Sequence, residues 1–142
     1  MERYEQIIAE ARSWVGTRFH HQGRCKRTRT HKGGVDCIGL LVGVGTALGM
    51  EIADKTDYAR LPESGKLEAA LDRYLMPKPL SEVLPGDVLL FTFEKAPQHV
   101  GIVSLLPDGE LGLIHAYMEA RGVVEHRLDQ HWWNKAVAAY WL

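Results

Sequence analysis

The sequence predicts an α+β fold, with helices in the first half of the chain and an antiparallel sheet in the second. Up to Met76 the apolar residues recur at three- and four-residue steps or form an unbroken run, as they do in amphipathic and buried helices. After Pro79, short apolar runs alternate with turns that contain Gly and Asp, which is typical of strands. Helices followed by an antiparallel meander make an α+β arrangement.

The periodicity predicts three helices: Glu2–Val15, Cys37–Leu48 and Pro62–Met76. The first and third are amphipathic, and Gly16 ends the first. The second is almost wholly apolar, so we expect it to be buried and to stop at Gly49. A polar connector over Ile52–Leu61 precedes the third helix.

Five strands are predicted after the turn at Leu84–Asp87: Val88–Phe93, His99–Leu106, Leu111–Met118, Val123–Leu128 and Val137–Leu142. Alternation places His99 and Gly101 on one face of their strand and Val100 and Ile102 on the other. If the two β-branched residues enter a barrel core, His99 faces the helices.

Length and composition limit the functions that the chain can have. Its 142 residues fit a single domain over residues 1–142, and a net charge of −1 with 25% charged residues does not favour nucleic-acid binding. The start of the chain lacks a basic segment followed by an apolar run, and no apolar stretch reaches the ~18 residues of a membrane span. We therefore expect synthesis in the cytoplasm, without a secretion signal and without a membrane span.

A local excess of positive charge lies between Arg18 and Lys32. This stretch has no periodicity, contains six Arg and Lys residues and three His residues, and has no carboxylate. It is predicted to be a long loop, Arg18–Gly34, either as solvated surface or as an electrostatic contact for an anionic partner.

Cys37 is the candidate nucleophile. It stands where the apolar helix begins, after Gly34, Val35 and Asp36. The free N–H groups of a helix N-terminus favour a thiolate over a thiol, so the position predicts a lowered thiol pKa.

Two histidines on neighbouring predicted strands are candidates for the base and for the residue that orients it. His99 and His115 lie on strands joined by a hairpin turn, so the two side chains can share a face and form a hydrogen bond. A nucleophile, a base and an orienting residue form the generalised catalytic triad.

Five segments of the chain stand in a specific order: Gly16–Gly23, Asp36–Leu40, Leu84–Phe91, His99–Val103 and Ile114–Ala116. Together they resemble the NlpC/p60 family of bacterial cell-wall cysteine peptidases, and the resemblance covers nearly the whole chain. It implies a papain-like fold in which the cysteine, at a helix start, packs against a small antiparallel barrel or sheet.

The resemblance also implies a reaction, namely hydrolysis of the bond between D-glutamate and the diamino acid of peptidoglycan stem peptides. Cys37 would be the nucleophile, His99 the base and His115 the orienting residue. Asp36 matches a carboxylate that in some members binds the free amine of the first alanine of the stem. No metal or other cofactor is implied.

Two residues depart from the family pattern. The family often has a tyrosine near His21 that helps to hold the oxyanion, so an imidazole N–H would act here. The family also commonly has serine after the cysteine, where this chain has Ile38, which favours intact wall over free stem peptide as the substrate. The small size and the absence of a signal or wall-binding repeat resemble the phage-tail and gene-transfer-agent branch, which implies tail proteins as partners and a place on a virion tail or phage-like particle.

Three alternatives remain at this stage. The first is a metal or structural module built from Cys25, Cys37 and the histidines of the basic loop, although their spacings fit no standard zinc pattern. The second is a catalytically silent tail or assembly protein that keeps the fold. The third is a cysteine- and histidine-dependent amidase that cuts elsewhere in the wall.

Overall fold

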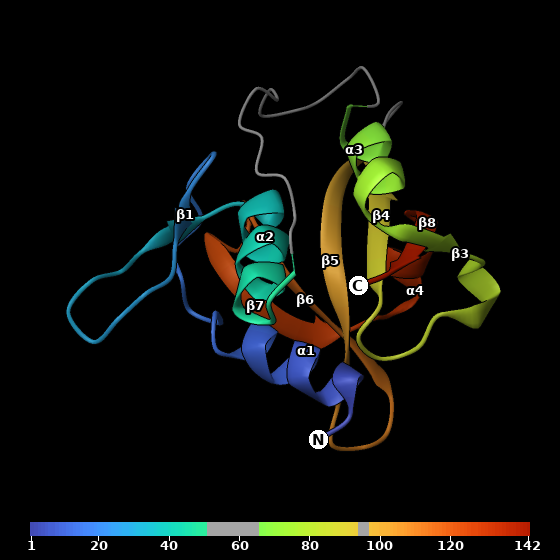
Figure 1. Cartoon of the computed structure of the whole chain (residues 1–142), viewed down its shortest axis with the longest axis horizontal. Coiled ribbons are helices and arrows are strands. Elements are labelled where there is room, and N and C mark those ends of the chain that lie inside the picture. Colours follow the sequence, from blue (N-terminus) through green and yellow to red (C-terminus); the bar gives the residue numbers. More distant parts are fainter. Residues whose placement is uncertain (51–65, 94–96) are drawn as a thin grey trace.

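A computed structural model describes residues 1–50, 66–93 and 97–142, and it confirms the α+β class (Figure 1). The helices are α1 (Arg3–Arg12), α2 (Cys37–Ala47), α3 (Lys66–Tyr74) and α4 (Gln130–Trp133), with a 3-10 turn η1 (Leu80–Glu82). The strands are β1 (Arg24–Cys25), β2 (Gly34–Val35), β3 (Met76–Lys78), β4 (Val88–Thr92), β5 (Pro97–Leu105), β6 (Leu111–Tyr117), β7 (Gly122–Arg127) and β8 (Ala136–Trp141).

The predicted helices are present, with shifted ends. A capping box between Glu2 and Glu5 starts α1, which ends at Arg12, three residues before the predicted end. Asp36 caps α2 and Gly49, with a φ of 80°, follows its C-terminus. The connector Ile52–Leu61 and the first residues of the third predicted helix lie outside the described residues. Within the described ranges, no helix is long and apolar enough to cross a bilayer.

The main sheet has the strand order β3-β8-β4-β5-β6-β7, and its adjacent strands are antiparallel. Strands β4 to β7 form the predicted meander, but β8 pairs with β4 rather than continuing after β7. This pairing covers the free edge of β4, which would otherwise expose its backbone groups. The sequence did not predict β3, which contains Pro77; proline is tolerated there because β3 is an edge strand.

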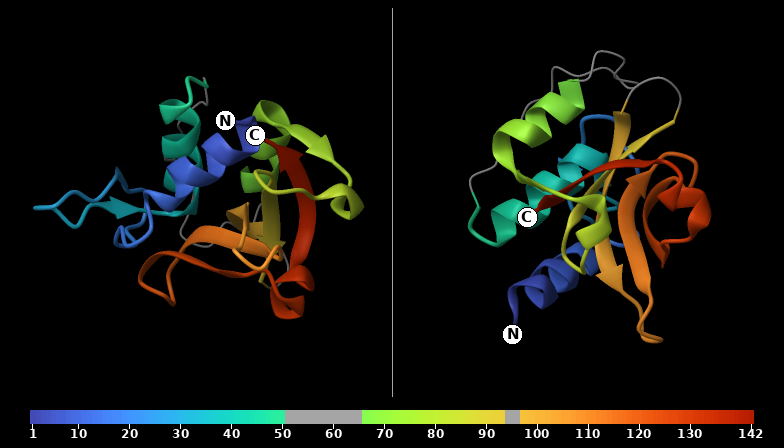
Figure 2. Two further views of the ribbon diagram at one scale, coloured as in Figure 1. Left: turned by 90° about the horizontal axis from the view of Figure 1, so that it is seen from below. Right: turned by 90° about the vertical axis from the view of Figure 1, so that its right-hand side faces the viewer.

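The sequence predicted a long irregular loop over Arg18–Gly34, and the structure corrects this in part. A short hairpin forms in it: β1 (Arg24–Cys25) pairs with β2 (Gly34–Val35), with Arg24 opposite Val35 and Cys25 opposite Gly34. Phe19 bridges to Val35, so the base of the stretch is tied to the rest of the fold. The hairpin extends away from the helices and the main sheet, as two views show (Figures 1 and 2).

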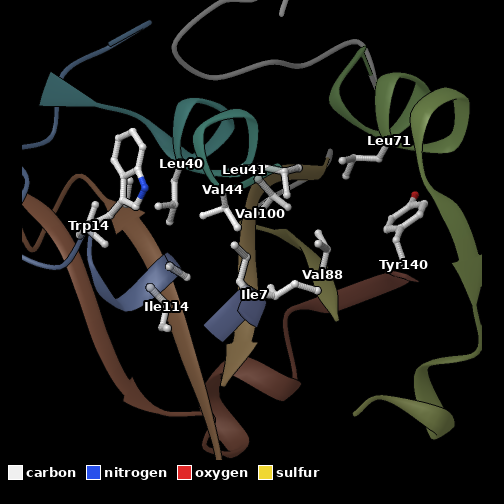
Figure 3. Close-up of a cluster of buried hydrophobic side chains, with 14 of the residues drawn as sticks. Ile7, Trp14, Leu40, Leu41, Val44, Leu71, Val88, Val100, Ile114 and Tyr140 are labelled. Atoms are coloured by element: carbon white, nitrogen blue, oxygen red, sulfur yellow. The ribbon is translucent and has the colours of Figure 1, made fainter. Parts of the chain in front are cut away.

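Helices α1, α2 and α3 cover one face of the main sheet, and the larger core lies between them (Figure 3). Val100 and Ile102 of β5 belong to this core, together with Ile7 of α1 and Leu40 of α2. The alternation along β5 is as predicted, but the expectation that His99 faces the helices is wrong. The amphipathic helices bury their apolar faces against the β-branched residues, which turns His99 to the opposite face.

That opposite face holds a second, smaller core. Phe91 of β4 and Leu113 of β6 pack there against Trp132 of α4. The sequence did not predict α4, which is only four residues long and is capped by Asp129. His99 lies among these residues, with its ring centroid 6.1 Å from that of Trp132.

Candidate active site

Cys37 is the first residue of α2 and is half-buried. Backbone N–H groups of Cys37 itself, Ile38 and Val100 donate hydrogen bonds toward its sulfur. The N–H of Val100 can point to the sulfur because the pairing of β5 with β6 starts only at Ile102, opposite Ile114. The start of α2 therefore meets β5 at the residue that follows His99.

The thiol of Cys37 is neutral at physiological pH. Burial of the sulfur, and then the negative charge of Asp36, raise the pKa of Cys37 to about 12, although the three N–H groups lower it. The sequence predicted a lowered pKa from the helix start, and this prediction is wrong. The helix N-terminus is outweighed first by burial of the sulfur and then by the negative charge of Asp36, the residue that caps the helix.

His99 and His115 are brought together as predicted. Nε2 of His99 lies 2.7 Å from Nδ1 of His115, and both side chains are buried. Gly101 makes the approach possible, because a Cβ at that position would come 3.2 Å from Cβ of His115. The glycine leaves the space in which the two rings meet diagonally across the strands.

A third histidine, which the sequence analysis did not single out, extends this pair. Nε2 of His115 lies 2.8 Å from Nε2 of His126 on β7, and Nδ1 of His126 lies 2.8 Å from the carbonyl oxygen of Arg127. His126 could have been found by the signal that paired the first two, because it is on the next strand of the same meander and two positions from the residue opposite His115, Val124.

Aromatic rings enclose His99 and His115 and keep them from water. Trp132 contacts His115 edge-on at 4.8 Å between centroids, and Tyr117 stacks on His115 at 5.1 Å. Burial lowers the pKa of His99 to about 3. Burial, followed by the repulsion that charged His99 and His126 would exert, lowers the pKa of His115 to about 2. Both rings are therefore neutral near pH 7.

Asp36 is buried and holds the loop before β1 against the start of α2. Its Oδ1 accepts hydrogen bonds from the backbone N–H of Gly39 at 2.8 Å and from the guanidinium of Arg24 at 3.1 Å. Its Oδ2 accepts from the backbone N–H of Gln22 at 2.8 Å. The carboxylate thus caps α2 and anchors this loop, a structural role that the sequence analysis did not predict.

Both cysteines are free, and Cys25 is exposed while Cys37 is half-buried. In the part of the chain that the structure describes, no three or more His, Cys, Asp and Glu side chains are grouped so that they could hold a metal ion.

A family model for NlpC/P60 matches residues 16–141. The chain belongs to the NlpC/P60 family. No functionally curated protein matches it.

Solved structures of NlpC/P60 proteins have the same fold. The NlpC/p60 domain of the peptidoglycan hydrolase SagA aligns with a TM-score of 0.65 and 20% identity, over 99% of this chain and 100% of that one. RipD from Mycobacterium tuberculosis, a non-catalytic NlpC/p60 domain protein adapted to peptidoglycan binding, aligns at 0.62 and 16%, over 100% and 98%. An N-acetylmuramoyl-L-alanine amidase from Bacteroides uniformis aligns at 0.59 and 14%, over 96% of each chain. At these identities the likeness is one of fold.

Within this NlpC/P60 chain, His21 lies in the turn between α1 and β1. Its carbonyl oxygen lies 3.0 Å from Nδ1 of His20, and the next residue, Gln22, is anchored to Asp36. The turn is thereby fixed beside the residue that precedes Cys37. Binding of the oxyanion by His21 and of a substrate amine by Asp36 stay predictions.

Proposed function

We propose that this chain is a cysteine peptidase that hydrolyses the bond between D-glutamate and the diamino acid of peptidoglycan stem peptides. The observation that carries the proposal is the 2.7 Å hydrogen bond between His99 and His115, formed beside the strand position that hydrogen-bonds the sulfur of Cys37. A buried imidazole held by a second one, on the residue that precedes Val100, and a thiol at a helix start are the groups that form a base paired with a nucleophile.

The reaction begins from a neutral thiol and a neutral imidazole. His99 accepts the proton from Cys37 as the sulfur attacks the carbonyl carbon of D-glutamate, and the oxyanion is held beside the start of α2, where His21 is the predicted donor. The C–N bond breaks, and His99 returns the proton to the amine of the diamino acid. Water then attacks the thioester with His99 as base, which releases the D-glutamate carboxylate and restores the thiol.

An amidase is the second candidate, because a solved amidase shares the fold. An amidase would use the same residues to cut the bond between the sugar lactyl group and L-alanine. A silent wall-binding protein is the third, as RipD, a non-catalytic NlpC/p60 domain protein, illustrates. The presence of Cys37 at a helix start together with the His99–His115 hydrogen bond favours an active enzyme, since these are the groups of a triad.

Mass spectrometry of purified sacculi after digestion separates the three candidates. A peptidase produces fragments with a new free amine on the diamino acid, and an amidase produces a new free amine on L-alanine. Cys37→Ala should abolish either product, while Cys25→Ser serves as the matched control and should retain activity. Sacculi that stay uncut by wild-type protein would refute both enzyme proposals.

We also propose intact wall rather than free stem peptide as the substrate. Ile38 offers no hydrogen bond to a substrate ammonium group, and the carboxylate of Asp36 already accepts three hydrogen bonds within the protein. A free alanine amine therefore adds little to binding. A comparison of free and N-acetylated stem peptides tests this, and a strict requirement for the free amine would contradict it.

The place of action is proposed as a virion tail or phage-like particle, with tail proteins as partners, where local wall digestion would assist penetration. The support is the family branch that the sequence resembles. Detection of the chain in purified particles by mass spectrometry tests the proposal, and its absence from them would count against it.

A further inference from the structure

Three histidines form a hydrogen-bonded chain that runs from β5 through β6 to β7, which lie side by side in the sheet (Figure 1). This series of hydrogen bonds starts at Nε2 of His99, passes through both nitrogens of His115 and of His126, and ends at the carbonyl oxygen of Arg127. Each link is between 2.7 and 2.8 Å long, so each must contain one proton.

The last link sets the direction of all the others. A carbonyl oxygen only accepts, so Nδ1 of His126 must donate to Arg127. A neutral imidazole has one N–H, which leaves Nε2 of His126 as an acceptor for Nε2–H of His115. Nδ1 of His115 is then an acceptor in turn, and it receives Nε2–H of His99.

This direction leaves the lone pair of His99 on Nδ1. In the described part of the chain, Nδ1 of His99 has no hydrogen-bond partner, and the residue after it donates its N–H to the sulfur of Cys37. An imidazole that abstracts the thiol proton must have this tautomer, because the opposite one presents an N–H to the thiol.

We propose that His126 is a positioning residue. Its hydrogen bond to the carbonyl oxygen of Arg127 fixes its own tautomer, and through His115 this fixes His99 in the tautomer that can accept the proton of Cys37. The proposal rests on the proposed function of His99 as the base. It assigns a role to a residue outside the triad: His126 touches neither substrate nor thiol and acts through His115. The same direction lets Nδ1 of His115 stabilise the imidazolium that forms when His99 takes up the proton.

Nitrogen-15 NMR of histidine-labelled protein at neutral pH tests the tautomers without reference to activity. The expected spectrum shows Nε2–H at His99 and His115 and Nδ1–H at His126. An Nδ1–H tautomer at His99 overturns the proposal, whatever the protein hydrolyses. The expected tautomers in a protein that leaves sacculi and stem peptides uncut would instead refute the proposed function alone.

Substitutions at His126 give a second test through kcat and KM on solubilised peptidoglycan. His126→Gln retains an acceptor for His115 and should stay within about threefold of wild-type kcat, whereas His126→Lys has donors only and should lower kcat by about a hundredfold or more, as wrong tautomers do in triad enzymes. KM should be nearly unchanged in both. His131→Lys, at an exposed histidine on α4, is the matched control.

The comparison of kcat between His126→Gln and His126→Lys separates a positioning role from a structural role. A structural role predicts that activity follows the free energy of unfolding, measured by urea denaturation, and that the His99 tautomer is the same in every variant. Equal kcat for His126→Gln and His126→Lys, with both folded, would overturn the proposal. A change of His99 to Nδ1–H in His126→Lys would support it directly.

Discussion

Gly101 lies directly against His115 across the β5–β6 boundary. A Cβ at Gly101 would stand 2.7 Å from Cδ1 of Leu113, closer than packed side chains allow, and 3.2 Å from Cβ of His115, a contact that requires His115 to shift slightly. The small residue therefore determines how near the ring of His115 can come to His99.

We expect Gly101→Ala to cost about 1–3 kcal/mol of unfolding free energy by overpacking, and to reduce hydrolysis by more than that loss explains, because His115 must move. Urea denaturation and kcat measure the two effects. Gly109→Ala is the control. The φ of 86° at Gly109 is strained for alanine, at a cost of about 1–2 kcal/mol, but the added Cβ would meet no neighbouring group. If both variants keep equal activity when folded, Gly101 has no role in placing His115.

The charge of Asp36 should be visible in the reactivity of Cys37. Asp36→Asn retains a helix-capping oxygen and removes the anion that raises the thiol pKa, so alkylation by iodoacetamide at pH 8 should be faster than in wild type. Asp36→Ala removes the charge and also the cap, which costs about 1 kcal/mol. Cys25 is replaced by Ser in all variants, so that Cys37 is the one thiol measured. Slower alkylation of Asp36→Asn than of wild type would contradict the electrostatic cause.

The buried histidines should make the protein less stable in mild acid. His99 and His115 have folded pKa values of about 3 and about 2, below their ordinary 6.5, so the unfolded chain binds more protons than the folded one between these limits. Stability therefore rises with pH in that window and falls as pH drops below about 6.5, by up to about 1.4 kcal/mol per pH unit for each histidine.

Urea denaturation at pH 7 and pH 5 measures this slope, in a range above the titration of ordinary carboxylates. The double variant His99→Gln, His115→Asn should be flatter than wild type, and His131→Gln should match wild type. A wild-type protein equally stable at both pH values would show that the histidines titrate near 6.5 when folded.

The basic hairpin should contribute to hydrolysis of intact wall through long-range attraction. Arg29 and Lys32 are exposed, and the potential around exposed charges is screened within about 10 Å at 0.1 M salt. We expect the rate on sacculi to fall as salt rises, and a double substitution of these residues by Gln to weaken that dependence. Arg3→Gln with Arg73→Gln, which removes two exposed charges outside the hairpin, is the matched control. An identical salt dependence in both double variants would leave the hairpin as solvated surface.

The sequence by itself determined the local structure and which residues are proposed as the reacting groups. An unbroken apolar run that stops at Gly49 predicts α2, alternation predicts the strands, and the hairpin between β5 and β6 is enough to bring His99 to His115. These properties depend on residues near one another in the chain, where periodicity and turn chemistry are informative.

Only the tertiary structure decided the environment of those groups. Three contacts join segments that are apart in sequence: β8 pairs with β4, Trp132 packs against the sheet, and the carboxylate of Asp36 accepts hydrogen bonds from Gln22 and Arg24. The pKa of Cys37 depends on the balance of burial, a neighbouring anion and N–H groups from two elements, which no local pattern contains. The polarity of the histidine chain is likewise set at its far end, by a backbone carbonyl on β7.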